Sequence, residues 1–345
     1  MRTILVTGGA GFIGSNFIPL FLEENPHFRV LNLDALTYAG SRSNLNVSRF
    51  KDRYEFVRGD ICNRQLVEFL FNQYDIRGVV HFAAESHVDN SISDPELFFR
   101  TNVLGTQVLL DIARTSWMKA PFSSKDEYED CRFHHISTDE VYGSLGETGL
   151  FTESTPLAPN SPYSASKAGS DMIVRSYFHT YGLNVVTTNC SNNYGPGQHT
   201  EKLIPKIIKR ALGAEKIPIY GDGRNIRDWL YVTDHCSAIN LVFHRGKAGE
   251  TYNIGGNNEK ENIYITNLIC EVLDRKLPLK HKSHSSYKDL ITFVEDRPGH
   301  DRRYAIDSSK ISFHLGWRPT ESFETGIVKT IDWYVDQWKA IVVGR

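Results

Sequence analysis

The chain has 345 residues, of which 40% are hydrophobic and 23% are charged, which is the composition of a globular protein with one large or two smaller domains. A formal net charge of −2 and a pI near 6.7 argue against a general nucleic-acid or membrane binder. The five scattered cysteines form no CxxC and no zinc-finger spacing. We therefore expect free thiols, no bound metal and a cytoplasmic location.

The first half alternates short apolar runs with longer amphipathic stretches. The runs predicted as strands are Ile4–Thr7, Val30–Leu33, Tyr54–Val57, Gly78–Ala84, Arg132–Ile136 and Asn184–Asn189. The stretches predicted as helices are Phe12–Glu24, with Pro19 inside it, Arg64–Tyr74, Leu97–Thr115 and Ser164–Tyr181. Strands that alternate with helices predict an α/β fold with a doubly wound parallel sheet, and apolar runs such as VVHF are typical of strands covered on both faces.

The pattern changes near residue 195. Three more helices are predicted, at Leu203–Leu212, Tyr264–Leu273 and Glu324–Trp338, separated by loops rich in Gly, Asp, Asn and Arg. We therefore predict a first domain over residues 1–195 and a smaller mixed α/β lobe over 196–345, from which the chain can cross back. The polar segment Lys119–Asp130 is predicted to be a surface loop.

The run TGGAGFIGS places Gly8, Gly11 and Gly14 between a predicted strand and a predicted helix. These glycines permit a tight turn, let the backbone approach a pyrophosphate and let the helix pack on the strand. Asp34 ends the next strand, where its carboxylate can accept hydrogen bonds from adenosine ribose hydroxyls and would repel a 2′-phosphate. The motif predicts a Rossmann domain that binds NAD rather than NADP.

Residues at the ends of the next strands are further candidates for cofactor contacts. Asp60 and Ile61 can flank the adenine, although a simple strand-end cap explains them too. Phe82, Ala83 and Ala84 include small residues that let a cofactor lie close, or that serve helix packing alone.

The segment SPYSASKAG places Tyr163 and Lys167 four residues apart, on one face of a helix. A lysine ammonium beside a phenol favours the phenolate, so Tyr163 can take a proton from a sugar hydroxyl near neutral pH. Lys167 can also hold the nicotinamide ribose. Pairs with this spacing also arise by chance.

Two adjacent acids, Asp139 and Glu140, follow the buried strand that ends in HHIST. Two close carboxylates in a desolvated site raise the pKa of one of them, so one can donate a proton while the other accepts one. The alternative is a pair of solvated loop acids. The sequence does not say which of the two would be protonated.

The motifs TGGAGFIG, HFAAESHVD, ISTDEVYG, YSASK, NCSNNYGP, EKLIP, IRDWLYV and DRPGHDRRYAID occur in this order. This set resembles the extended short-chain dehydrogenase/reductase family, and within it the nucleotide-sugar 4,6-dehydratases, over nearly the whole chain. The resemblance implies a nucleotide-diphosphate sugar substrate and an NAD that is tightly bound and regenerated in each turnover. It also implies Phe12, Ile13, Leu36, Thr37, Ser86, Thr101 and Asn193 as further cofactor contacts.

The resemblance implies dehydration of dTDP-glucose to dTDP-4-keto-6-deoxyglucose. Oxidation at carbon 4 makes the carbon 5 hydrogen acidic. Glu140 is then expected to remove that proton and Asp139 to protonate the departing carbon 6 hydroxyl, before the hydride returns to carbon 6. Thr138 is expected to bind the carbon 4 oxygen. The product class feeds rhamnose and other deoxysugars, which the sequence does not distinguish.

Residues that hold the substrate are also carried over from the family. Asn192 is expected at the sugar diphosphate and Ser86 and His87 at the hexose. Cationic groups would clamp the phosphates, because arginine offers them a planar fork. The remaining expected contacts are Lys202, Leu203, Arg227, Asn262, Arg297 and His300. Asn90, where the family usually carries Arg, and the stretch Pro196–Thr200 depart from its pattern and leave fine substrate contacts open.

Four alternatives stay open at this point. A nucleotide-sugar 4-epimerase shares the NAD site but needs no acid pair. A CDP-glucose dehydratase is expected to carry Lys in place of Glu140, and UDP-glucose differs from dTDP-glucose in its base by one methyl group. The fourth alternative is a binding or scaffold protein that kept the fold but lost catalytic activity. We also expect a homodimer formed through the helices Leu97–Thr115 and Ser164–Tyr181, as in the family.

Overall fold

A seven-stranded parallel sheet forms the centre of the computed structural model, which describes residues 1–279, 284–296 and 299–343. The strand order is β12-β8-β7-β4-β1-β2-β3. The strands are β1 (Arg2–Thr7), β2 (Phe28–Asp34), β3 (Tyr54–Arg58), β4 (Ile76–His81), β7 (Arg132–Thr138), β8 (Val185–Cys190) and β12 (Thr251–Ile254). The predicted α/β class with a doubly wound parallel sheet is therefore confirmed.

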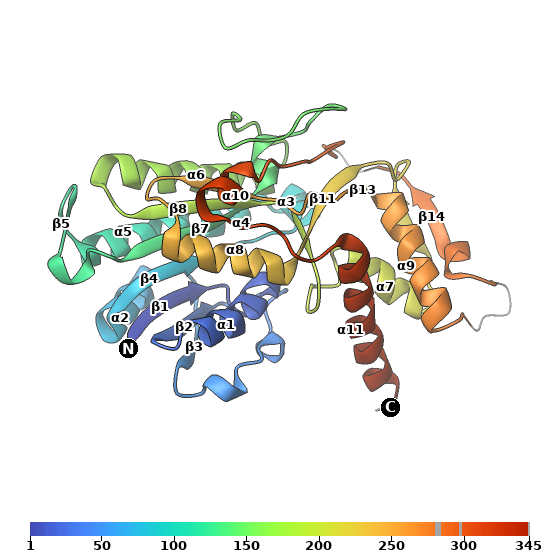
Figure 1. The fold of residues 1–345 in the computed structure, drawn as a ribbon, viewed down its shortest axis with the longest axis horizontal. Coiled ribbons are helices and arrows are strands. Elements are labelled where there is room, and N and C mark those ends of the chain that lie inside the picture. The colour runs from blue at the N-terminus through green and yellow to red at the C-terminus, as the bar shows by residue number, and fades with distance from the viewer. Residues whose placement is uncertain (280–283, 297–298, 344–345) are drawn as a thin grey trace.

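Helices cover both faces of this sheet (Figure 1). One face carries α1 (Phe12–Glu24) and α8 (Val232–Arg245), and the other carries α2 (Arg64–Tyr74), α5 (Thr106–Trp117) and α6 (Pro162–Tyr181). Because side chains alternate along a strand, Ile4 and Val6 pack with α1 and α8, whereas Leu5 packs with the other layer. All three are fully buried, which explains why the strand is apolar without interruption.

Most predicted elements of the first half are present, with shifted ends. Strand β4 ends at His81 instead of Ala84, and its last ladder bond runs from the N–H of Phe82 to the carbonyl of Thr7. Helix α6 begins at Pro162, ahead of the predicted Ser164, since the Ser161 hydroxyl caps it by accepting from the N–H of Ser164.

The long helix predicted at Leu97–Thr115 is a continuous helical run with a π-helical turn inside it. It consists of α4 (Pro95–Phe99), the π turn η3 (Arg100–Gly105) and α5, and it follows the short helix α3 (Val88–Ser93). The predicted surface loop Lys119–Asp130 contains most of a small hairpin, β5 (Met118–Ala120) with β6 (Ser123–Ser124), and the turn η4 (Asp126–Tyr128). Short turns η1 (Arg42–Asn44) and η2 (Ser48–Phe50) precede β3.

The prediction that loops fill the chain between Leu212 and Tyr264 is wrong. That stretch forms helix α8, whose buried side chains recur at Val232, Cys236, Ile239 and Phe243. The pattern was missed because His, Thr, Cys and Asn between them have low helix propensity. The same stretch also forms four strands, namely β10 (Ile217–Tyr220), β11 (Ile226–Tyr231), β12 and β13 (Glu259–Glu261).

The second lobe lies at one end of the sheet, on the opposite side of the molecule from the β5–β6 hairpin (Figure 1). It has a three-stranded sheet, β13-β11-β9, and a parallel pair of β10 with β14. Its further elements are β9 (Asn192–Tyr194), α7 (Leu203–Leu212), α9 (Asn262–Lys276), η6 (Tyr287–Leu290), β14 (Ile291–Val294) and α11 (Phe323–Val343), whereas α10 (Ser309–Leu315) packs beside β12 of the central sheet. An apolar core unites α7, α9 and α11.

The chain crosses between the two parts more than once. Strand β12, far beyond residue 195, pairs with β8 at the edge of the central sheet. Helix α8 packs on α1. A division into domains at residue 195 stays a prediction, but the central sheet takes residues from both of the predicted parts. Within the described residues, no helix has the length and apolarity needed to cross a lipid bilayer.

Candidate active site

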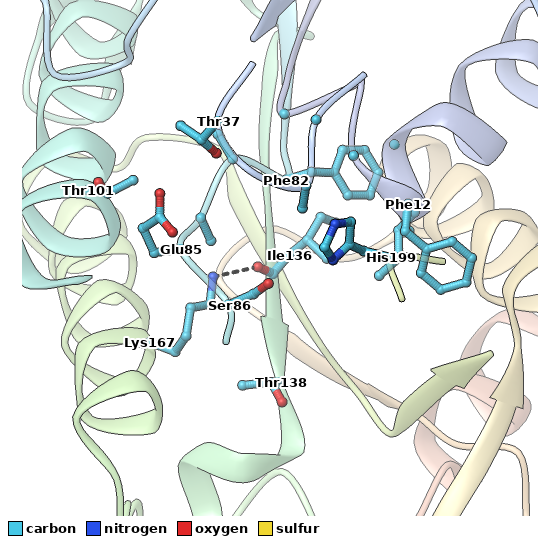
Figure 2. A pocket seen from close by; sticks show the side chains of 18 of the residues that line it. Phe12, Thr37, Phe82, Glu85, Ser86, Thr101, Ile136, Thr138, Lys167 and His199 are labelled. Carbon is cyan, nitrogen blue, oxygen red and sulfur yellow. Dashed lines mark hydrogen bonds between the residues drawn. The ribbon is translucent and has the colours of Figure 1, made fainter. Parts of the chain in front are cut away.

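A cavity of about 300 Å³ runs along the carboxyl ends of the central strands (Figure 2). Open parallel sheets bind their ligands at this edge. The predicted site residues that line it are Gly8, Gly11, Phe12, Ile13, Gly14, Asp34, Thr37, Asp60, Ile61, Phe82, Ala83, Ala84, Ser86, Thr101, Thr138, Asp139, Glu140, Tyr163, Lys167, Asn192, Asn193 and Lys202. The fold thus brings residues from distant motifs to one cavity.

Six other predicted residues do not line this cavity: Leu36, His87, Leu203, Arg227, Asn262 and His300. Arg297 lies outside the described residues. The roles expected for all seven stay predictions.

The glycine-rich turn forms a close cradle for a dinucleotide. Gly8 has φ +71°, and a Cβ added there would lie 2.6 Å from the backbone N and Cα of Ala83. A Cβ at Gly14 would lie 2.6 Å from the carbonyl oxygen of Gly8. Gly11 is the N-cap of α1 and has no capping side chain, and the first helical turn has no acid. The helix N-terminus therefore faces the cavity as an anion site, and these residues fit the pyrophosphate of NAD.

Replacing Gly8 by Ala should disrupt this turn. The new methyl group would strain a left-handed backbone and press on the Ala83 backbone, so we expect a loss of about 1–3 kcal/mol in the free energy of unfolding. NAD retained after purification should fall with it. Denaturant unfolding and cofactor content after gel filtration measure both. Gly146→Ala is the control, since a Cβ there meets nothing within 4 Å, and equal effects in both variants would contradict the prediction.

Asp34 is a buried anchor of the same turn. One carboxylate oxygen accepts from the N–H of Ala10 at 2.8 Å, and the other accepts from the N–H of Leu36 at 2.8 Å. Leu36 itself has φ 53°, so the loop is folded around this carboxylate. Each oxygen keeps a second lone pair, which leaves Asp34 able to accept from ribose hydroxyls, as the spacing predicted.

Tyr163 lies in the first turn of α6, and Lys167 lies one turn later. Both are buried, and the Lys167 ammonium donates to the carbonyl of Ile136 at 2.8 Å (Figure 2). Burial lowers the pKa of Lys167 to about 8.

We expected Lys167 to lower the pKa of Tyr163, but in the structure the pKa of Tyr163 is raised. Burial raises the pKa of Tyr163 well above its ordinary value, the charge of Glu140 raises it further, and a hydrogen bond with Thr138 offsets part of this rise. Lys167 is instead bonded to the Ile136 carbonyl. Tyr163 is therefore a phenol at neutral pH among these neighbours.

The acid pair follows β7 directly, where Thr138 caps a short turn, η5 (Asp139–Tyr142). Asp139 is 1% exposed, whereas Glu140 is half-buried. Burial and the negative charges of Glu140 and Asp228 raise the pKa of Asp139 well above its ordinary value, against the pull of Arg227. Asp139 is thus held as the neutral acid. Its Oδ2 has no hydrogen-bond partner within the described part of the chain, so it can donate to a ligand.

The opposite wall comes from the segments after β8 and β9. Lys202 lines the cavity and donates its ammonium to the carbonyl of Ser86 at 2.8 Å. Arg227 lies behind this wall, with its guanidinium 4.3 Å from the ring centre of Tyr304, and it donates to the carbonyl of Asp301. Burial and the charge of Glu140 raise the pKa of Tyr304. The charge of Arg227 lowers the pKa of both Tyr304 and Asp139 and so opposes part of the effect of burial.

Two acids and one histidine that line the cavity were not predicted as site residues: Glu85, His199 and Glu201. Glu85 lies in the quoted motif HFAAESHVD between two residues that were chosen, so the signal was present. Its backbone is held by Asn102 of the π turn, at 2.9 and 3.0 Å. His199 and Glu201 lie in and beside the stretch that departs from the family pattern. Glu201 also begins the quoted motif EKLIP, whereas the approach of His199 to the cofactor half is a tertiary contact with no local signal.

The fold and this site define an NAD-dependent enzyme of the extended short-chain dehydrogenase/reductase class. The sequence profile of the GDP-mannose 4,6 dehydratase family matches residues 5–330. The dTDP-glucose 4,6-dehydratase of Xanthomonas campestris pv. campestris (strain B100) is 53% identical over 97% of this chain and 93% of its own. The chain belongs to this nucleotide-sugar 4,6-dehydratase family, among the dTDP-glucose 4,6-dehydratases.

Two solved structures of the same family agree with this assignment. That of the dTDP-glucose 4,6-dehydratase of Bacillus anthracis str. Ames, in complex with NAD, is 46% identical with a TM-score of 0.84 and covers 98% of each chain. That of Streptomyces venezuelae, also with NAD bound, is 45% identical with a TM-score of 0.87 and covers 98% of each chain.

Proposed function

We propose that this chain dehydrates dTDP-glucose to dTDP-4-keto-6-deoxyglucose, as an NAD-dependent hydro-lyase. The observation that carries the proposal is a neutral buried acid, Asp139, next to Glu140 in the cavity that also holds Tyr163 and Lys167. An epimerase that stops at the 4-ketone has no use for such a pair. The names of the relatives support the same reaction.

The glycine turn, Asp34, Asp60 and the segment Phe82–Ala84 would hold NAD along the sheet edge. NAD supplies a hydride acceptor that later returns the same hydride, so the reaction needs no external oxidant. Tyr163, which its neighbours favour as a phenol, loses its phenolic proton before it accepts the proton of the carbon 4 hydroxyl, which Thr138 orients. Lys167 lies one turn away on α6 and would supply the nearest cationic group to the phenolate.

Elimination then depends on the acid pair. Glu140 removes the carbon 5 proton, which the carbon 4 ketone has made acidic. Asp139 donates its proton to the carbon 6 hydroxyl, which leaves as water. After the hydride returns to carbon 6, Glu140 gives a proton back to carbon 5. Burial of Asp139 makes this division possible, because it keeps one carboxyl group neutral beside an ionised one.

The substrate's diphosphate would lie toward Asn192 and Lys202, which line the wall that faces the glycine turn. A lysine ammonium offers a positive charge and N–H donors to phosphate oxygens. The choice of thymine as the base rests on the relatives' names.

The test is a turnover comparison of dTDP-, UDP- and CDP-glucose at equal concentration, with products identified by mass spectrometry. We expect loss of one water from dTDP-glucose at the highest kcat/KM. A product of unchanged mass, a 4-epimer, would contradict the proposal. Preferred turnover of UDP-glucose would contradict the base assignment and leave the chemistry in place.

We further propose a cytoplasmic homodimer. The five cysteines are all free, which fits a reducing compartment. Large apolar side chains are exposed on adjacent elements of one layer: Ile92, Leu97, Phe99, Leu104 and Met172. They lie on α3, α4, the π turn and α6, which contact one another. Pairing of these elements with a second copy would bury this patch.

Leu104→Asp should weaken this dimer, because Leu104 is 58% exposed within the patch and a charge there would be buried unpaired on association. We expect the dimer dissociation constant to rise by about tenfold or more. Light scattering after gel filtration over a dilution series measures it. Phe313→Asp on α10 is the matched control, since Phe313 is more exposed but lies off the patch. Equal behaviour of the two variants would refute the predicted interface.

A further inference from the structure

The proposed reaction leaves a proton imbalance in the protein, and the inference that follows rests on that proposed function. After one turnover, Tyr163 holds the proton of the carbon 4 hydroxyl, and Asp139 has lost its proton to the departing water. Glu140 is unchanged, because it returns what it took. Before the next turnover Tyr163 must lose one proton and Asp139 must gain one. Tyr163 is 9% exposed and lines the substrate cavity, so while a ligand fills that cavity its proton can leave only through the protein.

A second cavity, of about 370 Å³, lies behind α6. Its walls are α6, β8, β12, the loop Glu153–Leu157 and Lys310 of α10. A water molecule occupies about 30 Å³ of liquid, so the cavity has room for several. Nothing in the proposed reaction uses it.

Asp171 connects this cavity with the active site. It lies one turn after Lys167 on α6 and lines the second cavity. Its Oδ2 accepts from the hydroxyl of Ser137 at 2.9 Å, and Ser137 lines the first cavity. Its Oδ1 lies 3.1 Å from Nε2 of the buried His135. One carboxylate therefore bridges the polar layer between the two cavities.

The side-chain oxygen of Asn189 indicates that the second cavity holds water. Asn189 lines it and is 2% exposed, and its amide nitrogen donates to the hydroxyl of Tyr142 at 2.9 Å. Its Oδ1 is buried and finds no hydrogen-bond partner among the described residues. A buried carbonyl oxygen in such a position is satisfied by ordered water, because an unmade hydrogen bond is costly.

We propose that Asp171 and the cavity it lines form a proton exit for Tyr163 and Lys167, separate from the opening that admits the substrate. The proton held by Tyr163 passes by way of the Lys167 ammonium to the Ser137 hydroxyl, which lines the first cavity and gives its own proton to the Asp171 oxygen that it already contacts. Asp171 then passes its proton to water in the second cavity and so to solvent. Asp139 regains a proton from the substrate side after the product leaves. Only O–H and N–H bonds change, and nothing is oxidised or reduced.

The acidities of the two groups suit such a transfer. Burial lowers the pKa of Lys167 to about 8 and raises that of Asp171 to about 7, the latter against the pull of Lys167 and Ser137. A proton passes readily between groups of similar pKa. The ionisable groups around Asp171 and its cavity are Lys167, Arg175, His135, Tyr142, Glu153, Glu250 and Lys310.

The test compares Asp171→Asn with the wild-type holoenzyme. The amide keeps the shape and an acceptor but cannot carry a proton. We expect kcat to fall about tenfold or more, with KM for the nucleotide sugar within about twofold. The solvent deuterium isotope effect on kcat should increase, and added imidazole should raise kcat in proportion to its concentration. A merely structural role would not produce rescue by a small base.

Glu153→Gln is the matched control, since it removes another carboxylate from the wall of the same cavity. Asp171→Glu keeps a titrating group there and should recover most of kcat, which keeps the proposal testable if Asp171→Asn folds poorly. The proposed proton exit would be contradicted if Asp171→Asn kept the wild-type kcat, or if it lost kcat and added imidazole did not restore it. If the wild type dehydrates another nucleotide sugar and not dTDP-glucose, the proposed substrate is wrong. The same comparison of Asp171→Asn with the wild type on that sugar then tests the proton exit independently.

Discussion

Glu140→Gln should abolish exchange of the carbon 5 hydrogen and reduce dehydration by about 10²–10⁴-fold. The amide fills the same space in the cavity but cannot accept a proton from carbon. Because Tyr163 and Lys167 remain in place, oxidation at carbon 4 should proceed, and the 4-ketoglucose nucleotide should accumulate. Rapid quench in D₂O followed by mass spectrometry of the nucleotide sugars measures both the ketone and the deuterium at carbon 5.

Glu147→Gln is the matched control for that variant, because Glu147 is an exposed acid in the loop after η5 and does not line the cavity. It should behave as the wild type. Dehydration at the wild-type rate in Glu140→Gln would show that another group removes the proton. Glu201, which lines the same cavity, would then be the next residue to replace.

Asp139→Asn should separate the two halves of the elimination. Water loss should slow by about 10²–10⁴-fold, because an amide cannot protonate the departing hydroxyl. Exchange at carbon 5 should persist, since Glu140 is untouched, and recovered dTDP-glucose should carry deuterium there. The label in recovered substrate, measured against the yield of 4-keto-6-deoxy product, distinguishes this variant from Glu140→Gln.

The pH dependence follows from the same carboxyl group. The pKa of Asp139 is raised in the folded protein, so its proton stays bound at pH values where an ordinary aspartate is ionised. The donor is therefore present at low and neutral pH and is lost as pH rises through the raised pKa. The wild-type kcat should fall at high pH because Asp139 loses its proton. The residual kcat of Asp139→Asn should not show this fall, because the amide has no such proton to lose. If kcat falls in the same way at high pH in the wild type and in Asp139→Asn, Asp139 is not the proton donor.

Motifs that are contiguous in the chain were the easiest to interpret. The spacing of Gly8, Gly11 and Gly14 reports a local turn, and Asp34 follows at a distance set by one helix and one strand. The acid pair and the Tyr163–Lys167 pair are each defined by a few consecutive residues. All of them line one cavity because parallel strands end at the same edge of the sheet.

Features that depend on long-range contacts were not predictable from the residues. Helix α8 carries weak helix formers, and its helical state is supported by packing on α1. The pKa of Tyr163 depends on burial and on Glu140, neither of which a Y-x-x-x-K spacing contains. Asp171 lies one turn beyond the lysine and looks like an ordinary surface acid until the bond to Ser137 is seen.

The return of the chain to the central sheet has a consequence for synthesis on the ribosome. The apolar face formed by Ile4 and Val6 is covered by α8 as well as α1, and the edge of β8 is covered by β12. About 250 residues must therefore emerge before the first strand is shielded and the growing edge is paired. Pairings between distant segments slow folding and leave an aggregation-prone intermediate with exposed apolar surface. We therefore expect the edge of β8 to stay unpaired in a nascent chain until the ribosome has translated past β12.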